Sequence, residues 1–339
     1  MSSSQPPRLA VQALVRGSPI AAPLFLPIVF SLGSKLENLA LADFLSNPTK
    51  ITNALKQIQA FLPCDGLACY ADPYLEAEAL GCRVIWDDAR GARRGVTAPA
   101  AGVEISSEAL TGASRIPVAL DVMRRLKMML TERIALFAGV TGPLTLSARL
   151  AGGAAPSALL LERAADVTRL IAAKYADAGM NALFIVEDAV PAGTEETLEW
   201  WLATLSPVCN VVRFYEALPV VLLTQPGSFA QARELLLNRA REFVLCLPLL
   251  DEGMWEAAAR SHATNLGIAL PVEVFESDEP EFEAVRLATD RLVKSHRPVL
   301  VTTAGDLPLT TDMRALPQRI QTLRSVARGS SAGSWPASA

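Results

Sequence analysis

The sequence predicts an α/β protein that folds as a single (β/α)8 TIM barrel. Eight short apolar runs recur along the 339 residues, and each is followed by a longer stretch in which apolar residues recur at helical spacing. The composition, 51% hydrophobic and 19% charged, is sufficient for one large core. Eight alternating strands and helices are typical of this barrel, and an open doubly wound sheet is the structural alternative.

The predicted strands are the short apolar runs. They lie at residues 26–31, 66–70, 134–140, 182–186, 219–223, 243–247, 265–270 and 298–302. The predicted helices carry apolar residues three and four positions apart, and they cover residues 36–45, 49–61, 118–130, 156–178, 195–204, 228–241, 252–262, 281–295 and 312–326. One of them opens with Asn47-Pro48, a typical helix start.

The two ends of the chain and one internal segment depart from this alternation. Residues 1–18 and 328–339 are rich in Ser, Pro, Gly and Ala, so we expect a flexible N-terminal segment and a disordered tail around a barrel of residues 19–327. Residues 87–116 form a long connection after the second strand. Such a connection is uncommon unless it covers a site, so we interpret it as an insertion near the barrel mouth, with a disordered surface loop as the alternative.

Charge and residue usage exclude several classes of function. The net charge is −4 with Lys and Arg scattered, which argues against a nucleic-acid partner. No uninterrupted apolar run approaches the ~20 residues of a membrane span, so we expect a cytoplasmic protein without a membrane partner. The five cysteines show no C-x-x-C spacing, and His262 and His296 fall at helix ends, which disfavours a local zinc site and histidine-assisted nucleophilic catalysis.

The residues that follow the predicted strands are mostly acidic. Asp72 is the strongest catalytic candidate, because a carboxylate between an apolar strand and Pro73 must be paired or face a cavity; capping of the next helix is the alternative. Glu76 lies one helical turn further and is expected to face the same cavity. Glu187 is the third catalytic candidate, although adjacent acids such as Glu187 and Asp188 often cap the following helix.

Other polar side chains at strand ends are candidates for substrate binding. They are Lys35, Tyr74, Arg149, Asp188, Gln225 and Asp306. Arg149 can clamp an anionic ligand in bidentate fashion, and an ion pair with Asp72 or Glu187 is the alternative. Lys35 is likewise expected either to bind an anionic ligand or to form an ion pair.

Several motifs resemble the uroporphyrinogen decarboxylase superfamily. They are Pro27-Ile28-Val29-Phe30, Asp72 followed by Glu76-Ala77-Glu78-Ala79-Leu80-Gly81-Cys82, Gly142-Pro143-Leu144-Thr145-Leu146 with Gly152-Gly153, and Tyr175-Ala176-Asp177-Ala178-Gly179. The Glu-Ala-Glu-Ala-Leu-Gly form is more similar to the corrinoid-linked methyltransferase branch. The resemblance implies a (β/α)8 barrel whose mouth accepts a tetrapyrrole-type macrocycle or a methylcorrinoid protein.

The chain also departs from both branches of that family. The decarboxylases have arginines after the first strand, where this chain has only Lys35, and their tyrosine and histidine have no counterpart near Arg149 or at residues 303–308. Only the aspartate matches, at Asp72. The zinc-dependent methyltransferases have His-x-Cys after strand five and Cys after strand eight, where this chain has Leu223-Thr224-Gln225 and Thr303-Ala304-Gly305. No zinc is therefore expected at the family position.

Taken with these departures, the resemblance implies an enzyme that moves a methyl group between a small substrate and a corrinoid (methylcobalamin) or tetrahydrofolate carrier. Methyl transfer then proceeds without the usual metal, or with oxygen ligands from the acidic residues in its place. The alternatives are a divergent decarboxylase of a carboxylate substrate and a non-catalytic tetrapyrrole-binding or partner subunit. A small-molecule substrate, a corrinoid protein and a second copy of the chain are the expected partners.

Overall fold

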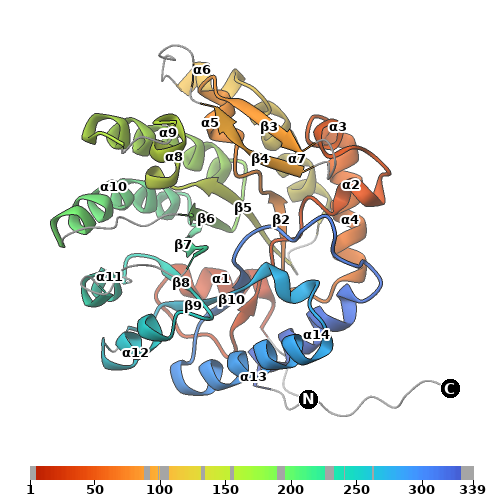
Figure 1. Ribbon diagram of the computed structural model, residues 1–339, viewed down its shortest axis with the longest axis vertical. Helices are drawn as coiled ribbons and strands as arrows, with labels where there is room; N and C mark the ends of the chain where they lie inside the picture. Colours follow the sequence, from red (N-terminus) through yellow and green to blue (C-terminus); the bar gives the residue numbers. More distant parts are fainter. Residues whose placement is uncertain are drawn as a thin grey trace.

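Eight parallel strands surrounded by helices form a nearly closed barrel (Figure 1). The computed structural model describes residues 5–87, 92–97, 99, 107–130, 134–152, 156–188, 195–225, 233–239, 241–261 and 263–329. The strands of the barrel are β1 (Leu24–Phe25), β2 (Gly66–Tyr70), β5 (Ala135–Thr141), β6 (Ala182–Glu187), β7 (Leu218–Leu223), β8 (Val244–Pro248), β9 (Leu266–Leu270) and β10 (Leu300–Thr303). They lie in the order β1-β10-β9-β8-β7-β6-β5-β2, which confirms the predicted fold class.

The helices cover the outside of the strands and return the chain to the N-terminal end of the barrel. The longer ones are α4 (Pro48–Phe61), α7 (Ile116–Met129), α9 (Ala158–Asp177), α10 (Glu195–Phe214), α12 (Glu252–Ser261), α13 (Glu279–His296) and α14 (Leu316–Ala327). The shorter ones are α2 (Gly33–Leu36), α3 (Leu41–Leu45), α5 (Leu75–Ala79), α6 (Ser107–Gly112), α8 (Pro143–Leu150), α11 (Arg233–Arg239) and the 3-10 helix η1 (Val272–Phe275). The expected cap of α4 is confirmed, because the Asn47 side chain accepts a hydrogen bond from Lys50 N at 3.1 Å.

The first strand is shorter than predicted and lies earlier in the chain. The sequence predicts a strand at residues 26–31, but β1 ends at Phe25. Beyond Leu26, the backbone bonds to side chains instead of a neighbouring strand: Ile28 N donates to Thr303 Oγ1 at 2.9 Å, and Phe30 N donates to Asp306 at 2.8 Å. The predicted run is buried, but its backbone is fixed by the side chain of Thr303, the last residue of β10, and by that of Asp306 in the following loop.

A buried aspartate joins the two edge strands, β1 and β2. Asp65 N donates to Phe25 O at 3.0 Å, and Phe25 N donates to Asp65 Oδ2 at 2.9 Å. The other carboxylate oxygen of Asp65 lies 2.6 Å from both Arg324 and Arg328 at the end of α14. This cluster stabilises the junction, and it corrects the predicted start of the disordered tail at residue 328, because the Arg328 side chain is anchored there. Residues 330–339 lie outside the described part of the chain.

The barrel interior has its own apolar core, to which the N-terminal segment contributes. Alternate strand residues such as Phe137, Phe184 and Leu222 point inward, and Ala10 and Val11 pack against the same cluster. These two residues belong to α1 (Pro7–Val15), a helix that contacts β5 and β7. The prediction of a flexible segment over residues 1–18 is therefore wrong for α1, because burial of its apolar face fixes it against the strands.

The segment between β2 and α7 contains structure of its own. β3 (Arg83–Asp87) and β4 (Ala92–Thr97) form an antiparallel hairpin, and β4 contacts α8. Helix α6 follows, while residues 88–91, 98 and 100–106 of the predicted insertion lie outside the described residues. Across the described residues, no helix is both long and apolar enough to span a membrane.

Candidate active site

A cavity of about 310 Å³ lies at the C-terminal ends of the barrel strands. Its apolar lining residues include Ile28, Val140, Val186 and Leu307. Its polar lining residues are Ser31, Asp72, Tyr74, Thr141, Arg149, Asp188, Thr224 and Asp306. They come from the C-terminal ends of β1, β2, β5, β6, β7 and β10 and the segments that follow these strands, because parallel strands in a barrel end at the same face.

Asp72 lies on the cavity wall, and an arginine from the start of α7 holds it. The Asp72 side chain is fully buried in its surroundings, and Oδ2 forms an ion pair with Arg115 Nη1. Oδ1 accepts a hydrogen bond from Tyr74 N at 3.1 Å, which fixes the turn into α5. The same guanidinium binds Glu78, with Nε 3.1 Å from Oε2. Asp72 therefore has a compensating positive charge beside it, and the residue lines the cavity.

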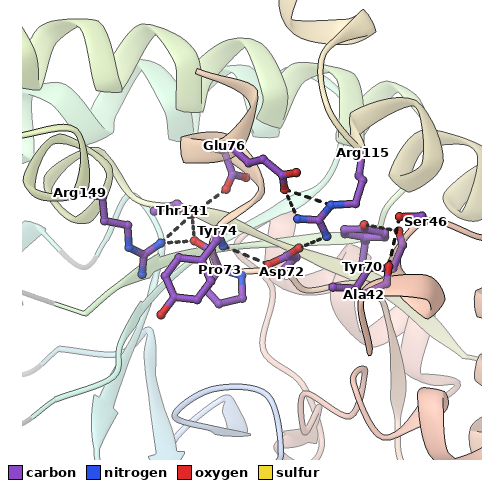
Figure 2. A network of polar contacts seen from close by, with 12 residues as sticks. Ala42, Ser46, Tyr70, Asp72, Pro73, Tyr74, Glu76, Arg115, Thr141 and Arg149 are labelled. Carbon is purple, nitrogen blue, oxygen red and sulfur yellow. Dashed lines mark hydrogen bonds and ion pairs between the residues drawn. The ribbon is translucent and has the colours of Figure 1, made fainter. Parts of the chain in front are cut away.

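Glu76 is fully buried on α5 and does not line the cavity, and its side chain points toward Thr141 (Figure 2). Its Oε2 lies 2.6 Å from Thr141 Oγ1, and Thr141 is the residue that lines the cavity at this point. Burial raises the pKa of Glu76 from 4.5 to about 7, although the Thr141 hydrogen bond acts in the opposite direction. The expectation that Glu76 faces the same cavity as Asp72 is not met, because Asp72 precedes α5 and helical spacing does not relate the two side chains.

Arg149 crosses the cavity rim from α8. Its Nη1 donates to Pro73 O, its Nη2 pairs with Asp188, and the guanidinium carbon lies 4.8 Å from the centroid of the Tyr74 ring. The partner of Arg149 is thus Asp188 and not Asp72 or Glu187, the two partners weighed from the sequence. Asp188 Oδ1 also accepts a hydrogen bond from Thr224 Oγ1 at 3.1 Å. These contacts join the ends of β2, β6 and β7 into one polar rim.

Glu187 is fully buried and serves as the N-terminal anchor of α8. It accepts hydrogen bonds from Leu144 N at 3.1 Å, Thr145 N at 2.8 Å and Trp201 Nε1 at 2.9 Å. Burial raises the pKa of Glu187 from 4.5 to about 7. Gly142 makes room for it, because a Cβ at that position would overlap the Glu187 carboxyl group. Glu187 does not line the cavity. It caps α8, which precedes it in the chain, and not the helix that follows it.

The remaining predicted site residues divide into two groups. Asp306 lines the cavity and also accepts hydrogen bonds from Phe30 N at 2.8 Å and Ser31 N at 2.9 Å, so it fixes the loop after β1. Lys35 and Gln225 are exposed and do not line the cavity, and Lys35 Nζ donates to Thr311 O at 3.2 Å. The structure therefore brings together five predicted residues: Asp72, Tyr74, Arg149, Asp188 and Asp306.

The structure also shows a site residue that the sequence analysis missed. Arg115 lies 43 residues beyond Asp72, at the end of the predicted insertion, and no spacing rule connects the two. The only available signal was indirect, since a buried carboxylate requires a cation. Arg115 meets that requirement.

The donor set does not fit the zinc site of the resembling methyltransferases. Thr224 and Thr303 offer hydroxyl oxygens where those enzymes have imidazole and thiolate ligands. Burial raises the pKa of the Cys209 thiol to about 12, so it keeps its proton. Among the described residues, no three His, Cys, Asp or Glu side chains are grouped closely enough to hold a metal ion. His296 bonds the backbone of Trp255 at 3.0 Å, and His262 lies outside the described residues.

Comparison with known proteins gives a family match for part of the barrel. The family model for uroporphyrinogen decarboxylase (URO-D) matches residues 26–194. A methyltransferase from Methanosarcina mazei has a TM-score of 0.76 at 11% identity, over 95% of this chain and 98% of that one. A B12-independent methionine synthase from Shewanella sp. W3-18-1, in complex with selenomethionine, has a TM-score of 0.55 at 11% identity, over 84% of this chain and 88% of that one. No curated protein matches the sequence.

At 11% identity the two solved structures share the fold with this chain, and the family match adds the sequence pattern. The matched segment contains Asp72, Glu76, Thr141, Arg149 and Glu187. Residues 26–194 therefore match the uroporphyrinogen decarboxylase family, and they form part of a (β/α)8 barrel.

Proposed function

We propose that this barrel is a methyl-transfer enzyme, which moves a methyl group between a small substrate in the cavity and a corrinoid or tetrahydrofolate carrier at its mouth. The observation that carries the proposal is the buried Asp72 carboxylate, which Arg115 holds beside the cavity at the strand ends. The sequence pattern of the methyltransferase branch and the shared fold support the same activity.

The site has two adjoining cavities, and their sizes favour different positions for the substrate and the methyl carrier. At about 310 Å³, the inner cavity is near the lower end of the range for small-molecule sites, roughly 300 to 1,000 Å³. A second cavity of about 520 Å³ adjoins it, between Tyr74, Arg149, Asp188 and the β4 residues Gly95, Val96 and Thr97. This arrangement favours a small substrate inside and a large carrier outside, next to the hairpin.

Asp72 supplies the chemistry that methyl transfer requires from the protein. A methyl acceptor becomes nucleophilic when it loses a proton, and a positioned carboxylate orients the acceptor for that loss. The carrier, when bound, supplies or receives the methyl group. Arg149, Tyr74 and Thr224 restrict how a substrate can lie against Asp72, which brings the reacting atoms into line. We derive no step through zinc, since its family ligands are replaced here.

The direct test is a methyl-transfer assay with purified protein. Methylcobalamin and methyltetrahydrofolate are each incubated with a panel of thiol, amine and alcohol acceptors, and loss of the methyl-cobalt absorbance or of the methylated folate is followed. We expect turnover that falls by about 10²- to 10⁴-fold in Asp72→Asn. Glu78→Gln is the matched control, because Glu78 shares Arg115 but does not line the cavity. Absence of turnover with every carrier and acceptor refutes the proposal.

A second candidate is decarboxylation of a carboxylate substrate, which the family match and the position of Asp72 favour. Arg149 is the only arginine or lysine that lines the inner cavity within the described residues, and Asp188 already pairs with it. The site therefore suits a substrate with few carboxylates. Release of carbon dioxide that is unchanged in Asp72→Asn argues against this function. A non-catalytic binding subunit is the remaining alternative, and turnover of any substrate eliminates it.

A further inference from the structure

Glu76 is a fully buried carboxyl group with no cation of its own. Its Oε1 has no hydrogen-bond partner, and its Oε2 lies 2.6 Å from the Thr141 hydroxyl. The backbone amides of Glu76 and Thr141 lower the pKa of Glu76, but burial has the larger effect and raises it. Arg115 is engaged by Asp72 and Glu78, and Arg149 by Asp188 and Pro73 O. Ionisation of Glu76 would therefore leave a buried negative charge without a partner, which favours the protonated acid.

The hydrogen count at Thr141 leads to the same conclusion. Thr141 Oγ1 has one hydrogen, but it lies 2.6 Å from Glu76 Oε2 and 2.9 Å from Pro73 O, which can only accept. If Glu76 is protonated, it donates to Thr141, and Thr141 donates to Pro73 O. Both contacts are then hydrogen bonds. If Glu76 is ionised, the single hydrogen serves one of two acceptors.

The charged and titratable groups around Glu76 do not favour its ionisation. They are Asp72 and Tyr70 on the β2 side, Tyr175 on α9, Arg115 at the start of α7 and Arg149 on α8. Burial and the Asp72 charge both raise the pKa of Glu76, and burial raises the pKa of Tyr175 well above its usual value, so the phenol also stays neutral. The two arginines carry positive charge, but both are paired with other carboxylates.

Thr141 connects this buried acid to the inner cavity. It lies at the end of β5 and lines the cavity, and Glu76, which does not line the cavity, contacts it (Figure 2). We propose that Glu76 stores a proton and exchanges it with a ligand in the cavity through the Thr141 hydroxyl. The purpose of this relay rests on the proposed methyl transfer, and it identifies the substrate class as one whose reacting heteroatom gains or loses a proton.

The proton balance is the same in both directions of the reaction. When a protic acceptor is methylated, the bond between the methyl group and its carrier breaks as the X–CH3 bond forms. The X–H proton then passes to Thr141 Oγ1, and the proton of Thr141 passes to the ionised Glu76. When a methylated substrate is demethylated, the leaving heteroatom takes the Thr141 proton, and Thr141 takes the proton of neutral Glu76. Glu76 acts through Thr141 and is a positioning residue for the proton, since it does not touch the substrate.

Three substitutions separate a relay from a structural role. Glu76→Gln keeps the shape of the side chain but cannot titrate. Thr141→Val removes the connecting hydroxyl and keeps the volume. Thr168→Val is the matched control, because the buried Thr168 hydroxyl donates to the Thr141 carbonyl at 2.9 Å and lies outside the relay.

The first measurement needs no substrate. Infrared spectra of the full-length protein at pH 6 should show a protonated carboxylic acid band that is lost in Glu76→Gln, and transfer into D2O should shift this band as the proton exchanges. We expect exchange to slow by roughly tenfold or more in Thr141→Val and to stay within about twofold in Thr168→Val. Absence of a band that depends on Glu76, or exchange in Thr141→Val as fast as in the wild type, overturns the relay. The band of Glu187, the other buried acid with a raised pKa, remains as an internal reference.

The second measurement is the pH profile of methyl transfer. We expect a change in rate near pH 7 that is absent in Glu76→Gln and Thr141→Val and present in Thr168→Val. A profile with the same inflection in all four proteins overturns the relay. Lack of any methyl transfer refutes only the proposed function, and the exchange rates then decide the relay by themselves.

Discussion

Arg115 pairs with the buried carboxylate of Asp72 across 43 residues of sequence. The pair joins the loop after β2 to the first turn of α7, at the point where the chain returns from the hairpin segment to the barrel. One guanidinium therefore fixes the principal acidic group of the cavity and also fixes the end of the insertion. Glu78 on α5 shares the same cation and links the two segments further.

Removal of this cation should destabilise the protein strongly. We expect Arg115→Met to lower the free energy of unfolding by about 3–5 kcal/mol, because the buried Asp72 carboxylate loses its ion pair with Arg115. Urea unfolding followed by circular dichroism measures the change. Arg169→Met, which removes an exposed i,i+3 pair with Asp166, should change stability by less than about 1 kcal/mol. Equal unfolding midpoints for the two variants contradict the expectation.

The raised pKa of Glu76 predicts a pH-dependent stability. The folded pKa of about 7 lies above the ordinary value of 4.5, so this group's contribution is fully present below pH 4.5 and is lost as the pH rises through 7. Between pH 5 and pH 8 the free energy of unfolding should fall by roughly 2–3 kcal/mol more in the wild type than in Glu76→Gln. Urea titrations at both pH values test this.

The control for the pH experiment is the exposed Glu283, whose pKa is lowered by a hydrogen bond from Arg286. Glu283→Gln should preserve the wild-type decline, since the group responsible is still present. Parallel stability curves for the wild type and Glu76→Gln rule out a neutral Glu76 in the folded protein.

The junction of β1 and β2 should depend on the charge of Asp65. Asparagine can still accept the hydrogen bond from Phe25 N, but it leaves Arg324 and Arg328 without an anion. We expect Asp65→Asn to lower the free energy of unfolding by about 2–4 kcal/mol and to speed amide hydrogen exchange in α14. Asp290→Asn, in an exposed pair with Lys294, should leave both measurements near wild type. Unchanged protection of α14 in Asp65→Asn shows that the charge is dispensable.

The docking of α1 can be tested with two residues of opposite exposure. Val11 is 1% exposed and contacts the barrel interior, whereas Leu9 is 47% exposed. A buried aspartate would have no partner in that apolar core, so Val11→Asp should release α1, with a loss of about 1.5–3 kcal/mol or more. Hydrogen exchange of the α1 amides should become fast in Val11→Asp and stay slow in Leu9→Asp. Slow exchange in both variants is the opposing result.

The fold could be predicted because barrel strands and helices leave a periodic pattern in the sequence. The limits appear where side chains, and not periodicity, determine the backbone. The run at residues 26–31 is apolar like a strand, but Thr303 and Asp306 hold its backbone, and that long-range contact leaves no local pattern. Helix α1 was missed because its neighbours are rich in Ser and Pro, although Ala10 and Val11 are buried.

The candidate site could likewise be predicted only in part. Asp72, Tyr74, Arg149, Asp188 and Asp306 line one cavity, because the strand order brings their loops to one end of the barrel. Which way a side chain points within such a loop depends on neighbours that are distant in the chain. Glu187 turns toward the backbone of α8 and Glu76 toward Thr141, so neither lines the cavity. Arg115 was outside the reach of any spacing argument for the same reason.

The absence of a side chain at position 142 has a consequence for the geometry of the rim. Even an alanine methyl group there would collide with Glu187, and the displaced carboxyl group would release the first turn of α8. The guanidinium at the other end of that helix would then lose its place above the aromatic ring of Tyr74. The selectivity of the rim for a ligand therefore depends on the absence of a side chain at Gly142, although no ligand needs to contact this residue.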